Sequence, residues 1–359
     1  MEQDPLAQPG MTLLAVDIGR GTQDVLVYDP GRPVENCVKM VLPAPTAVVA
    51  QRIREAGARG EAIFLDGYTM GGGDSVQAVS EHLRKGLSVF ATEPAALTIH
   101  DNLEKVRSLG IQLVSSQPPD TTLVRTTDYM EAEIRVALRA FGVPYPVDHA
   151  FAVQDHGFSP AESNRLHRFR VMGDLLEEGD WQIWALARDP PLPTMTRMAA
   201  LRGQAPGSLV IDTGPAALLG ALCDPWVKER AQDGVTLVNA GNAHTFCVNL
   251  HGEEVCGIVE HHTHSLDRAH LLSLIGKLRE GTLTNEEIFR DGGHGARVHR
   301  PHPSKYLAVT GPNRKGILPD AYQAAPYGDM MLTGCFGLVR AWGKMRGKSP
   351  FLTRAVEAA

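Results

Sequence analysis

Short apolar runs alternate with amphipathic stretches along most of the chain, and most runs end at a glycine or a polar residue. Residues 13–28 read as two strands joined by a glycine-rich turn, and the alternation over 34–42 adds a third strand. Residues 235–259 repeat this three-stranded pattern much later in the chain. The remaining strands alternate with helices, which is typical of an α/β layer architecture. The pattern predicts helices over 47–58, 75–85, 97–109, 129–141, 159–178, 216–222, 267–279, 285–290 and 329–345, and further strands over 62–65, 87–91, 111–114, 150–154, 209–212 and 306–310.

The two meanders carry nearly the same loop after their first strand. Glycines at these turns let backbone N–H groups approach an anion, and Thr22 and Thr245 are placed to donate to a phosphate oxygen. We therefore expect the two loops to face each other and to hold the phosphates of a nucleotide from both sides. The candidate residues are Asp17, Gly19, Arg20, Gly21 and Thr22 in the first loop and Asn239, Gly241, Asn242, His244 and Thr245 in the second.

Length and composition fit a globular protein with two cores, because the 359 residues are 43% hydrophobic. The net charge of −6 and the low aromatic content of 6% indicate that nucleic acid is not a partner. Five cysteines are scattered, without the close spacing of an iron–sulfur site or a disulfide framework. No stretch approaches about 18 uninterrupted apolar residues, so we expect no membrane span and a cytoplasmic protein.

Five segments, in chain order, resemble the nucleotide-site motifs of the actin, sugar-kinase and heat-shock-protein ATPase superfamily. The two glycine loops resemble its phosphate motifs, while residues 211–220, 307–314 and 328–337 resemble its first connecting motif, its adenosine motif and its second connecting helix. The resemblance implies an α/β fold of two ribonuclease-H-like lobes of the actin-like ATPase type, with a nucleotide cleft between them. It also implies an N-terminal lobe over 11–206 with an inserted substrate region, a C-terminal lobe over 207–328, and a C-terminal helix over 329–357 that packs back on the first lobe.

This resemblance assigns roles to individual residues. Asp17 and Asp212 would be catalytic and face each other across the phosphates of ATP, with a hydrated Mg²⁺ on Asp17. Asp212 has a second interpretation, because it precedes a helix whose N-terminus an acid stabilises. Small residues in 216–220 and 334–337 would let two helices cross closely. The residues that would frame the adenosine are Gly311, Asn313 and Arg314.

More narrowly, the whole chain resembles a branch of archaeal and anaerobic bacterial proteins that is labelled pyruvate formate-lyase activating enzyme-like. This label implies radical chemistry on an iron–sulfur cluster held by three close cysteines. Because the chain has no such run of cysteines, we expect no cluster. The segments that carry the resemblance are 67–73, 153–157, 239–245, 260–263 and 293–295.

Several histidines lie in polar, glycine-flanked clusters near the ends of predicted strands. Imidazoles in such positions bind transition metals or act as acids and bases, but they also hydrogen-bond loops together. No spacing matches a zinc motif. Adjacent His261 and His262 point to opposite faces of a strand, so only one of them faces a given site. The hypothetical ligands of a transition metal are His156, His262 and His294.

Three functions follow as hypotheses. The first is an ATP-dependent phosphotransferase or ATPase that binds Mg-ATP and acts on a small molecule. The second is a non-enzymatic, nucleotide-responsive activator of a partner enzyme, because Asn239 replaces the usual acid of the second phosphate motif. The third is a histidine-metal-dependent hydrolase or lyase. The substrate and the oligomeric state stay open, with a homodimer among the alternatives. The candidate substrate-facing residues are Gly71, Gly72, Gly73, Asp155 and His156.

Overall fold

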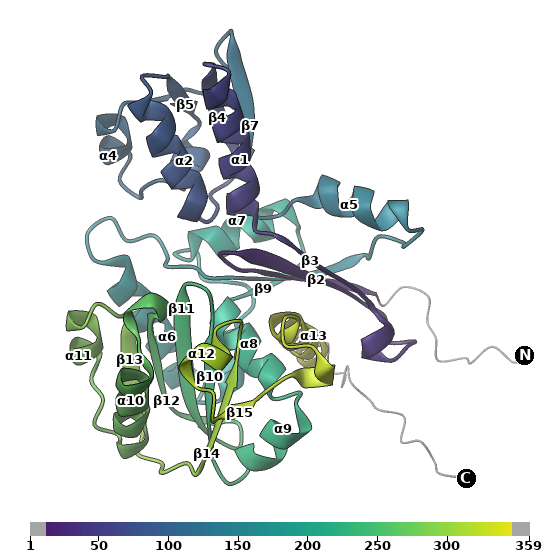
Figure 1. Ribbon diagram of the computed structural model, residues 1–359, viewed down its shortest axis with the longest axis vertical. Coiled ribbons are helices and arrows are strands. Elements are labelled where there is room, and N and C mark those ends of the chain that lie inside the picture. Colours follow the sequence, from purple (N-terminus) through teal and green to yellow (C-terminus); the bar gives the residue numbers. More distant parts are fainter. Residues whose placement is uncertain (1–11, 347–359) are drawn as a thin grey trace, which may run out of the picture.

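Three β-sheets organise the computed structural model, which describes residues 12–346. Sheet A has the strand order β3-β2-β1-β8-β9, sheet B has the order β6-β5-β4-β7, and sheet C has the order β13-β12-β11-β10-β14-β15. Figure 1 shows sheet B and its helices at one end of the molecule, sheet C at the other, and sheet A between them. The predicted α/β class is confirmed.

Sheets A and C share one plan. In each, an antiparallel meander of three strands is extended by two strands that run parallel to its first strand. Sheet C also carries β13, antiparallel to β12. Sheet A consists of β1 (Leu13–Ile18), β2 (Thr22–Tyr28), β3 (Val38–Pro43), β8 (Asp148–Val153) and β9 (Leu209–Ile211). Sheet C consists of β10 (Val235–Ala240), β11 (His244–His251), β12 (Glu254–His262), β13 (Gly295–Val298), β14 (Tyr306–Thr310) and β15 (Tyr322–Gln323).

Sheet B is a separate, wholly parallel sheet inserted between β3 and β8. Its apolar core is made of its own strands and the helices beside them. The strands are β4 (Ala62–Gly67), β5 (Val89–Ala91), β6 (Ile111–Leu113) and β7 (Thr121–Thr126). The helices are α1 (Pro45–Ala58), α2 (Gly73–Arg84), α3 (Glu93–Ala96) and α4 (Leu103–Ser108).

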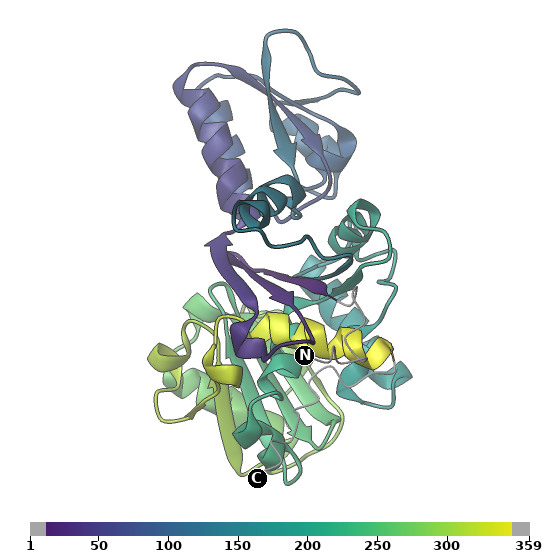
Figure 2. The ribbon, with the colours of Figure 1, turned by 90° about the vertical axis from the view of Figure 1, so that its right-hand side faces the viewer.

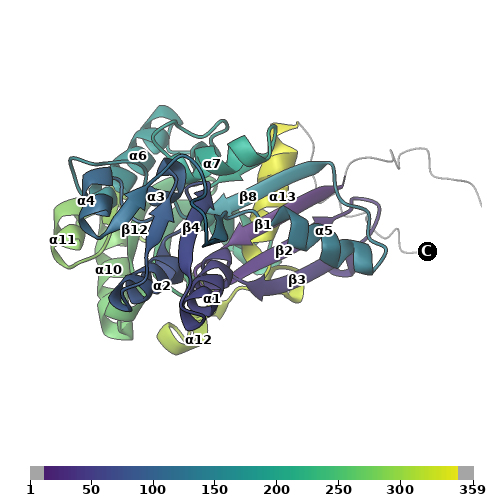
Figure 3. The ribbon, with the colours of Figure 1, turned by 90° about the horizontal axis from the view of Figure 1, so that it is seen from above.

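The remaining helices pack around sheets A and C. Seen from above in Figure 3, α13 crosses beneath the strands of sheet A, and α13 contacts β1, β2 and β8. These helices are α5 (Glu131–Ala140), α6 (Asn164–Glu178), α7 (Thr196–Gln204), α8 (Thr213–Ala221), α9 (Pro225–Ala231), α10 (Arg268–Glu280), α11 (Asn285–Arg290), α12 (Arg314–Ile317) and α13 (Thr333–Met345). Short 3₁₀ turns cover Val34–Asn36, Ile183–Ala187, Thr263–Ser265 and Pro326–Gly328.

Helices α8 and α13 cross in backbone contact, as the small residues of both segments predict. A Cβ on Gly220 would overlap the carbonyl oxygen of Thr333, and a Cβ on Gly337 would overlap that of Ala216. The largest apolar core joins this helix pair to one face of sheet A and one face of sheet C. Figure 2 shows α13 in yellow running across the middle of the molecule. The crossing therefore connects the two sheets.

The prediction of a single continuous helix over 97–109 is wrong. The chain forms α3 and α4 instead, because the side chain of Asn102 accepts hydrogen bonds from the N–H groups of Glu104 and Lys105 and so starts a new helix. Apolar periodicity did not reveal this cap. Strands β7 and β13 and helices α7 and α9 were also not predicted.

The division into two lobes stays a prediction. Strand β9 pairs with β8 in sheet A, although it follows the expected boundary at residue 206. Residues 347–357 of the expected C-terminal helix and residue 11 of the expected first lobe lie outside the described residues. Within 12–346, no helix combines the length and apolar character that crossing a bilayer requires.

The close crossing of α8 and α13 predicts that a methyl group added at the crossing lowers stability, whereas one added in open space does not. Gly337→Ala should lower the free energy of unfolding by about 2 kcal/mol or more, because the new Cβ meets backbone that cannot rotate away. Gly276→Ala, in open space on α10, should leave the protein unchanged or raise its stability by about 1 kcal/mol. Urea unfolding of both variants measures the difference, and equal stabilities would contradict the close crossing.

Candidate functional site

The two glycine turns close with the same hydrogen bond. The N–H of Gly19 donates to the carbonyl of Thr22, and the N–H of Gly241 donates to the carbonyl of His244, both at 2.9 Å. His244 is therefore the structural counterpart of Thr22. The sequence comparison had matched Thr22 with Thr245, which is one residue too far along β11.

The side chain of Thr245 is buried and contacts Thr263. Its side chain is only 1% exposed, and its hydroxyl lies 3.1 Å from the hydroxyl of Thr263. Thr263 in turn donates to the carbonyl of Gly241 at 2.8 Å. This burial contradicts the expected contact between Thr245 and a phosphate, and it makes Thr245 a support of the second turn.

The two turns meet. A Cβ placed on Gly21 in the first turn would lie 2.8 Å from the side-chain nitrogen of Asn242 in the second. Gly21, Asn242 and the neighbouring Arg20 are exposed, while Gly19 and Gly241 are half-buried. The turns thus bring two sets of backbone N–H groups from sheets A and C to one place at the surface, as expected.

The expected adenosine segment lies against the second turn. Gly311 has a φ of +91°, and a Cβ there would come within 2.5 Å of the carbonyl oxygen of Ala240. The backbone N–H of Asn313 donates to that same oxygen at 3.1 Å, and its side chain donates to the carbonyl of Gly241 at 2.9 Å. Arg314 donates to the carbonyl of Gly311 at 3.1 Å. These residues, with Asn239 at the end of β10, form one group.

A pair of acids lies beside the first turn. Asp17 on β1 stands directly opposite Asp24 on β2, so both side chains share one face of sheet A. The hydroxyl of Thr213 donates to Asp17 at 2.6 Å, and Gly334 of α13 leaves the room that the Asp17 carboxylate occupies. Asp24 is 7% exposed, and one of its carboxyl oxygens has no hydrogen-bond partner.

Both acids hold their protons more tightly than usual. Burial raises the pKa of Asp17 to about 6, with the hydrogen bond from Thr213 lowering it and the nearby Asp212 raising it. Burial and the neighbouring Asp17 raise the pKa of Asp24 to about 8, and the hydrogen bond from Thr22 opposes them. Sequence reasoning missed Asp24, although counting outward from the turn along the two paired strands places it opposite Asp17.

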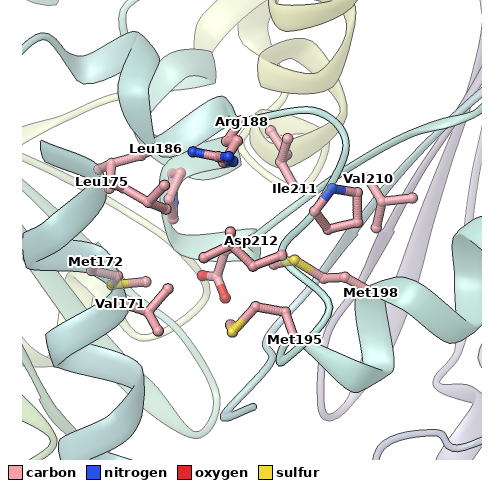
Figure 4. Close-up of a pocket in the computed structure, with 13 residues that line it drawn as sticks. Val171, Met172, Leu175, Leu186, Arg188, Met195, Met198, Val210, Ile211 and Asp212 are labelled. Atoms are coloured by element: carbon pink, nitrogen blue, oxygen red, sulfur yellow. The ribbon is translucent and has the colours of Figure 1, made fainter. Parts of the chain in front are cut away.

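Asp212 is fully engaged in structural contacts. Its carboxylate is 4% exposed, accepts a hydrogen bond from the N–H of Gly214 at 3.0 Å and caps α8. Arg168 binds both of its oxygens, one of them at 2.9 Å. Figure 4 shows Asp212 beside a pocket whose other lining residues are mostly apolar, including Met195 and Val210. The structure shows the second interpretation of Asp212, the helix cap, and the catalytic role stays a prediction.

Arg168 links Asp212 to a histidine cluster. Its guanidinium also donates to Glu260 on β12 at 2.8 Å, and Glu260 contacts Nδ1 of His294 at 2.9 Å. Burial alone would raise the pKa of Glu260, but Arg168 and His294 hold it well below its usual range. Sequence reasoning missed this network, because nothing in the helical pattern of 164–178 marks Arg168 as buried.

Three imidazoles converge in front of Glu260. One ring nitrogen each of His156, His244 and His294 lies within 4.8 Å of the others. His262 is adjacent, with its ring centre 4.8 Å from that of His294, but it is not part of this closest set. The structure therefore keeps His156 and His294 of the expected trio and puts His244 in place of His262. Burial lowers the pKa of His156 well below its usual range and that of His244 to about 3.

The expected substrate-facing residues lie in different environments. Asp155 is buried and accepts hydrogen bonds from the N–H groups of Gly157 at 2.8 Å and Met198 at 2.9 Å, which contradicts direct contact with a substrate. Gly71 donates to the carboxylate of Asp128, which is also bound by Arg197. Gly72 and Gly73 begin α2, and the role of this turn in substrate binding stays a prediction.

The cysteines do not fit an iron–sulfur cluster. All five are free, and the one group of three or more potential metal ligands in the described part of the chain is the histidine trio, which contains no cysteine. Burial raises the pKa of each thiol, which opposes the thiolate that cluster ligation requires. The affected residues are Cys37, Cys223, Cys247, Cys256 and Cys335.

The acid pair predicts a stability that falls as pH rises. Between the ordinary value of 3.8 and about 8, folded Asp24 keeps a proton that the unfolded chain has released, so each unit of pH weakens the folded state. Asp24→Asn should therefore be more stable than the parent at pH 8, by about 1 kcal/mol or more, and equally stable near pH 4. Thermal unfolding in a chelator, with exposed Asp174→Asn as control, measures this, and a pH-independent difference would contradict it.

Comparisons with known proteins place the chain in a family. The chain aligns with the structure of the Aquifex aeolicus member of the Ppx/GppA protein family (10% identity, 84% of this chain, 67% of that chain, TM-score 0.28) and with that of an exopolyphosphatase-like protein (9%, 84%, 66%, 0.27). A second Aquifex aeolicus structure, of the PPX-GPPA enzyme, aligns over 94% of both chains at 9% identity and a TM-score of 0.30. No curated protein matches significantly. A family model described as "Putative pyruvate format-lyase activating enzyme (DUF1786)" matches residues 70–316, more than half of the sequence, and the chain belongs to this family.

Proposed function

We propose that the protein is an ATP-dependent phosphotransferase or ATPase that binds Mg-ATP in a cleft between two ribonuclease-H-like lobes and acts on a small molecule. The meeting of the two glycine turns carries this proposal. Turns with the same closing hydrogen bond come from two different sheets, and Gly21 touches Asn242. Paired turns of this kind offer N–H groups to a chain of phosphates from two sides.

The shared strand order of sheets A and C supports the two-lobed arrangement. Each lobe would consist of a meander with two parallel strands, and the crossed helices α8 and α13 would connect the lobes. The expected adenosine segment lies against the second turn and comprises Gly311, Asn313 and Arg314. If Gly241 binds the phosphates of ATP, the adenosine of the same molecule would lie beside this segment. The positive φ of Gly311 lets its backbone lie this close to β10.

The acid pair fits Mg²⁺. Asp24 has a buried oxygen without a partner, and Asp17 lies across the strand pair from it with a raised pKa. Carboxylate oxygens are ligands that Mg²⁺ prefers, and water molecules commonly complete its shell. Asp17, through water, and Asp24 would hold the ion, which would offset the negative charge that phosphoryl transfer develops.

Asp17 is then the group that acts on the attacking oxygen. Its carboxylate is held by Thr213 and faces Gly334, whereas both oxygens of Asp212 are occupied by Arg168. With a pKa of about 6, Asp17 is ionised near neutral pH and can orient or deprotonate the nucleophile. Asp212 would position Thr213 and the start of α8 without touching the reacting atoms.

A second candidate, a nucleotide-responsive activator of a partner enzyme, is favoured by one residue. Asn239 occupies on β10 the place that Asp17 occupies on β1, so the second turn lacks a charged partner for the metal. Such a protein would bind ATP with little hydrolysis. Measuring phosphate release at saturating ATP separates the two candidates.

Nucleotide binding should depend on Gly311. Gly311→Ala should weaken Mg-ATP binding at least tenfold, because a Cβ there would press against Ala240 and displace the second turn. Gly252→Ala is the matched control, since Gly252 also has a positive φ of +62° but open space around it. Isothermal titration calorimetry measures both, and failure of the parent protein to bind ATP, with or without Mg²⁺, would overturn the proposed function.

Turnover should depend on Asp17. Asp17→Asn keeps the shape of the side chain but removes the proton acceptor, so kcat should fall at least about a hundredfold while the protein stays folded. Exposed Asp174→Asn should retain the parent rate. Steady-state phosphate release measures both variants, and full activity of Asp17→Asn would exclude the assigned role.

A further inference from the structure

The histidine cluster is assembled from both halves of the structure. His156 follows β8 of sheet A, His244 begins β11 of sheet C, and His294 precedes β13 of sheet C. The pairing of Glu260 with Gly295 holds the segment of His294 against β12, and the pairing of β11 with β12 places His244 in the same region. Residues far apart in the sequence therefore bring three ring nitrogens within 4.8 Å of one another.

The spacing of these nitrogens suits a metal ion. The Nε2 atoms of His156 and His294 are 3.4 Å apart. Two imidazoles that bind one tetrahedral zinc ion at 2.0–2.1 Å have their nitrogens about 3.3 Å apart. A small rotation of His244 would bring the third nitrogen into the same range, because its side chain is only partly buried.

One of the imidazoles is already oriented as a ligand. Nδ1 of His294 lies 2.9 Å from a carboxylate oxygen of Glu260, so Nδ1 donates its proton there and Nε2 offers its lone pair to the cluster. Glu260 is fixed by Arg168 at 2.8 Å and by Gln154 at 3.2 Å. A buried carboxylate behind a histidine is a recurrent support of metal-binding imidazoles.

We infer that His156, His244 and His294 form a binding site for a divalent transition-metal ion such as Zn²⁺, with a coordination position left for water or an oxygen of the substrate. Neutral imidazoles favour such ions over Mg²⁺. His244 closes the second glycine turn, so the ion would lie next to the bound anion. The site is distinct from the acid pair at Asp17 and does not require that ATP binds.

A direct His156–His294 hydrogen bond is the competing explanation for their proximity. That bond would need no metal, and it would serve only to join the two segments. A metal site predicts that the protein binds one metal ion per chain, whereas a purely structural hydrogen bond predicts no such binding.

The test is a titration of the metal-free protein with Zn²⁺ against a competing chromophoric chelator, without nucleotide. One equivalent should bind. His156→Ala and His294→Ala should each weaken binding at least a hundredfold, and Glu260→Gln about ten- to a hundredfold. His262→Ala should have a smaller effect than His244→Ala. Exposed His251→Ala is the control and should bind like the parent.

Co²⁺ provides a second readout, because four-coordinate Co²⁺ with nitrogen ligands has a visible spectrum that should appear in the parent and disappear in His294→Ala. Circular dichroism confirms that the variants are folded. Absence of stoichiometric binding in the parent, or equal affinity in the His156→Ala, His294→Ala double variant, overturns the inference. Because no nucleotide is present, either result is separate from the fate of the proposed ATPase function.

Discussion

The buried guanidinium of Arg168 connects helix α8, strand β12 and its own helix α6 through ion pairs. It has no exposed surface, and it binds Asp212 at the start of α8 and Glu260 in β12 at the same time. A delocalised cation with several donors in fixed directions can satisfy two carboxylates at once, which an ammonium group cannot do as well. Removal of Arg168 would leave two carboxylates in the interior without their shared cation, at a cost of about 3–5 kcal/mol or more. One side chain from α6 thus fixes both the helix that reaches Asp17 and the strand that supports the histidines.

This arrangement divides the buried acids of the protein into two classes. Asp212 and Glu260 both form ion pairs with Arg168, and Glu260 also contacts His294. Asp17 and Asp24 lie opposite each other on the paired strands, no ion pair joins either of them to a cation within residues 12–346, and burial is the main cause that raises the pKa of both. Buried acids without a cation keep their protons to a higher pH, and a bound metal ion can take the place of those protons. The unbalanced pair is the place where a cation has most to contribute.

Local patterns in the sequence predicted what depends on local chemistry. The repeated glycine turns, the order of most strands and the close helix crossing all follow from apolar periodicity and small residues. The match of Thr22 to Thr245 failed because it followed residue type, whereas the equal spacing from Gly19 and Gly241 aligns Thr22 with His244. Asp24 escaped notice because its importance comes from the strand opposite, and Arg168 because a charged residue on a helix is usually solvated. Pairing within a hairpin decided the first two positions, and distant ion-pair partners decided that of Arg168.

The contact between α8 and α13 has a mechanical consequence. Backbone lies directly against backbone where Gly220 and Gly337 meet, so a movement of either helix at this point is passed on to the other without a flexible side chain between them. Gly334 lies three residues before Gly337 and therefore on the same side of α13. The carboxylate of Asp17 rests against that glycine. A displacement of α13 at the crossing would therefore alter the surroundings of Asp17 directly.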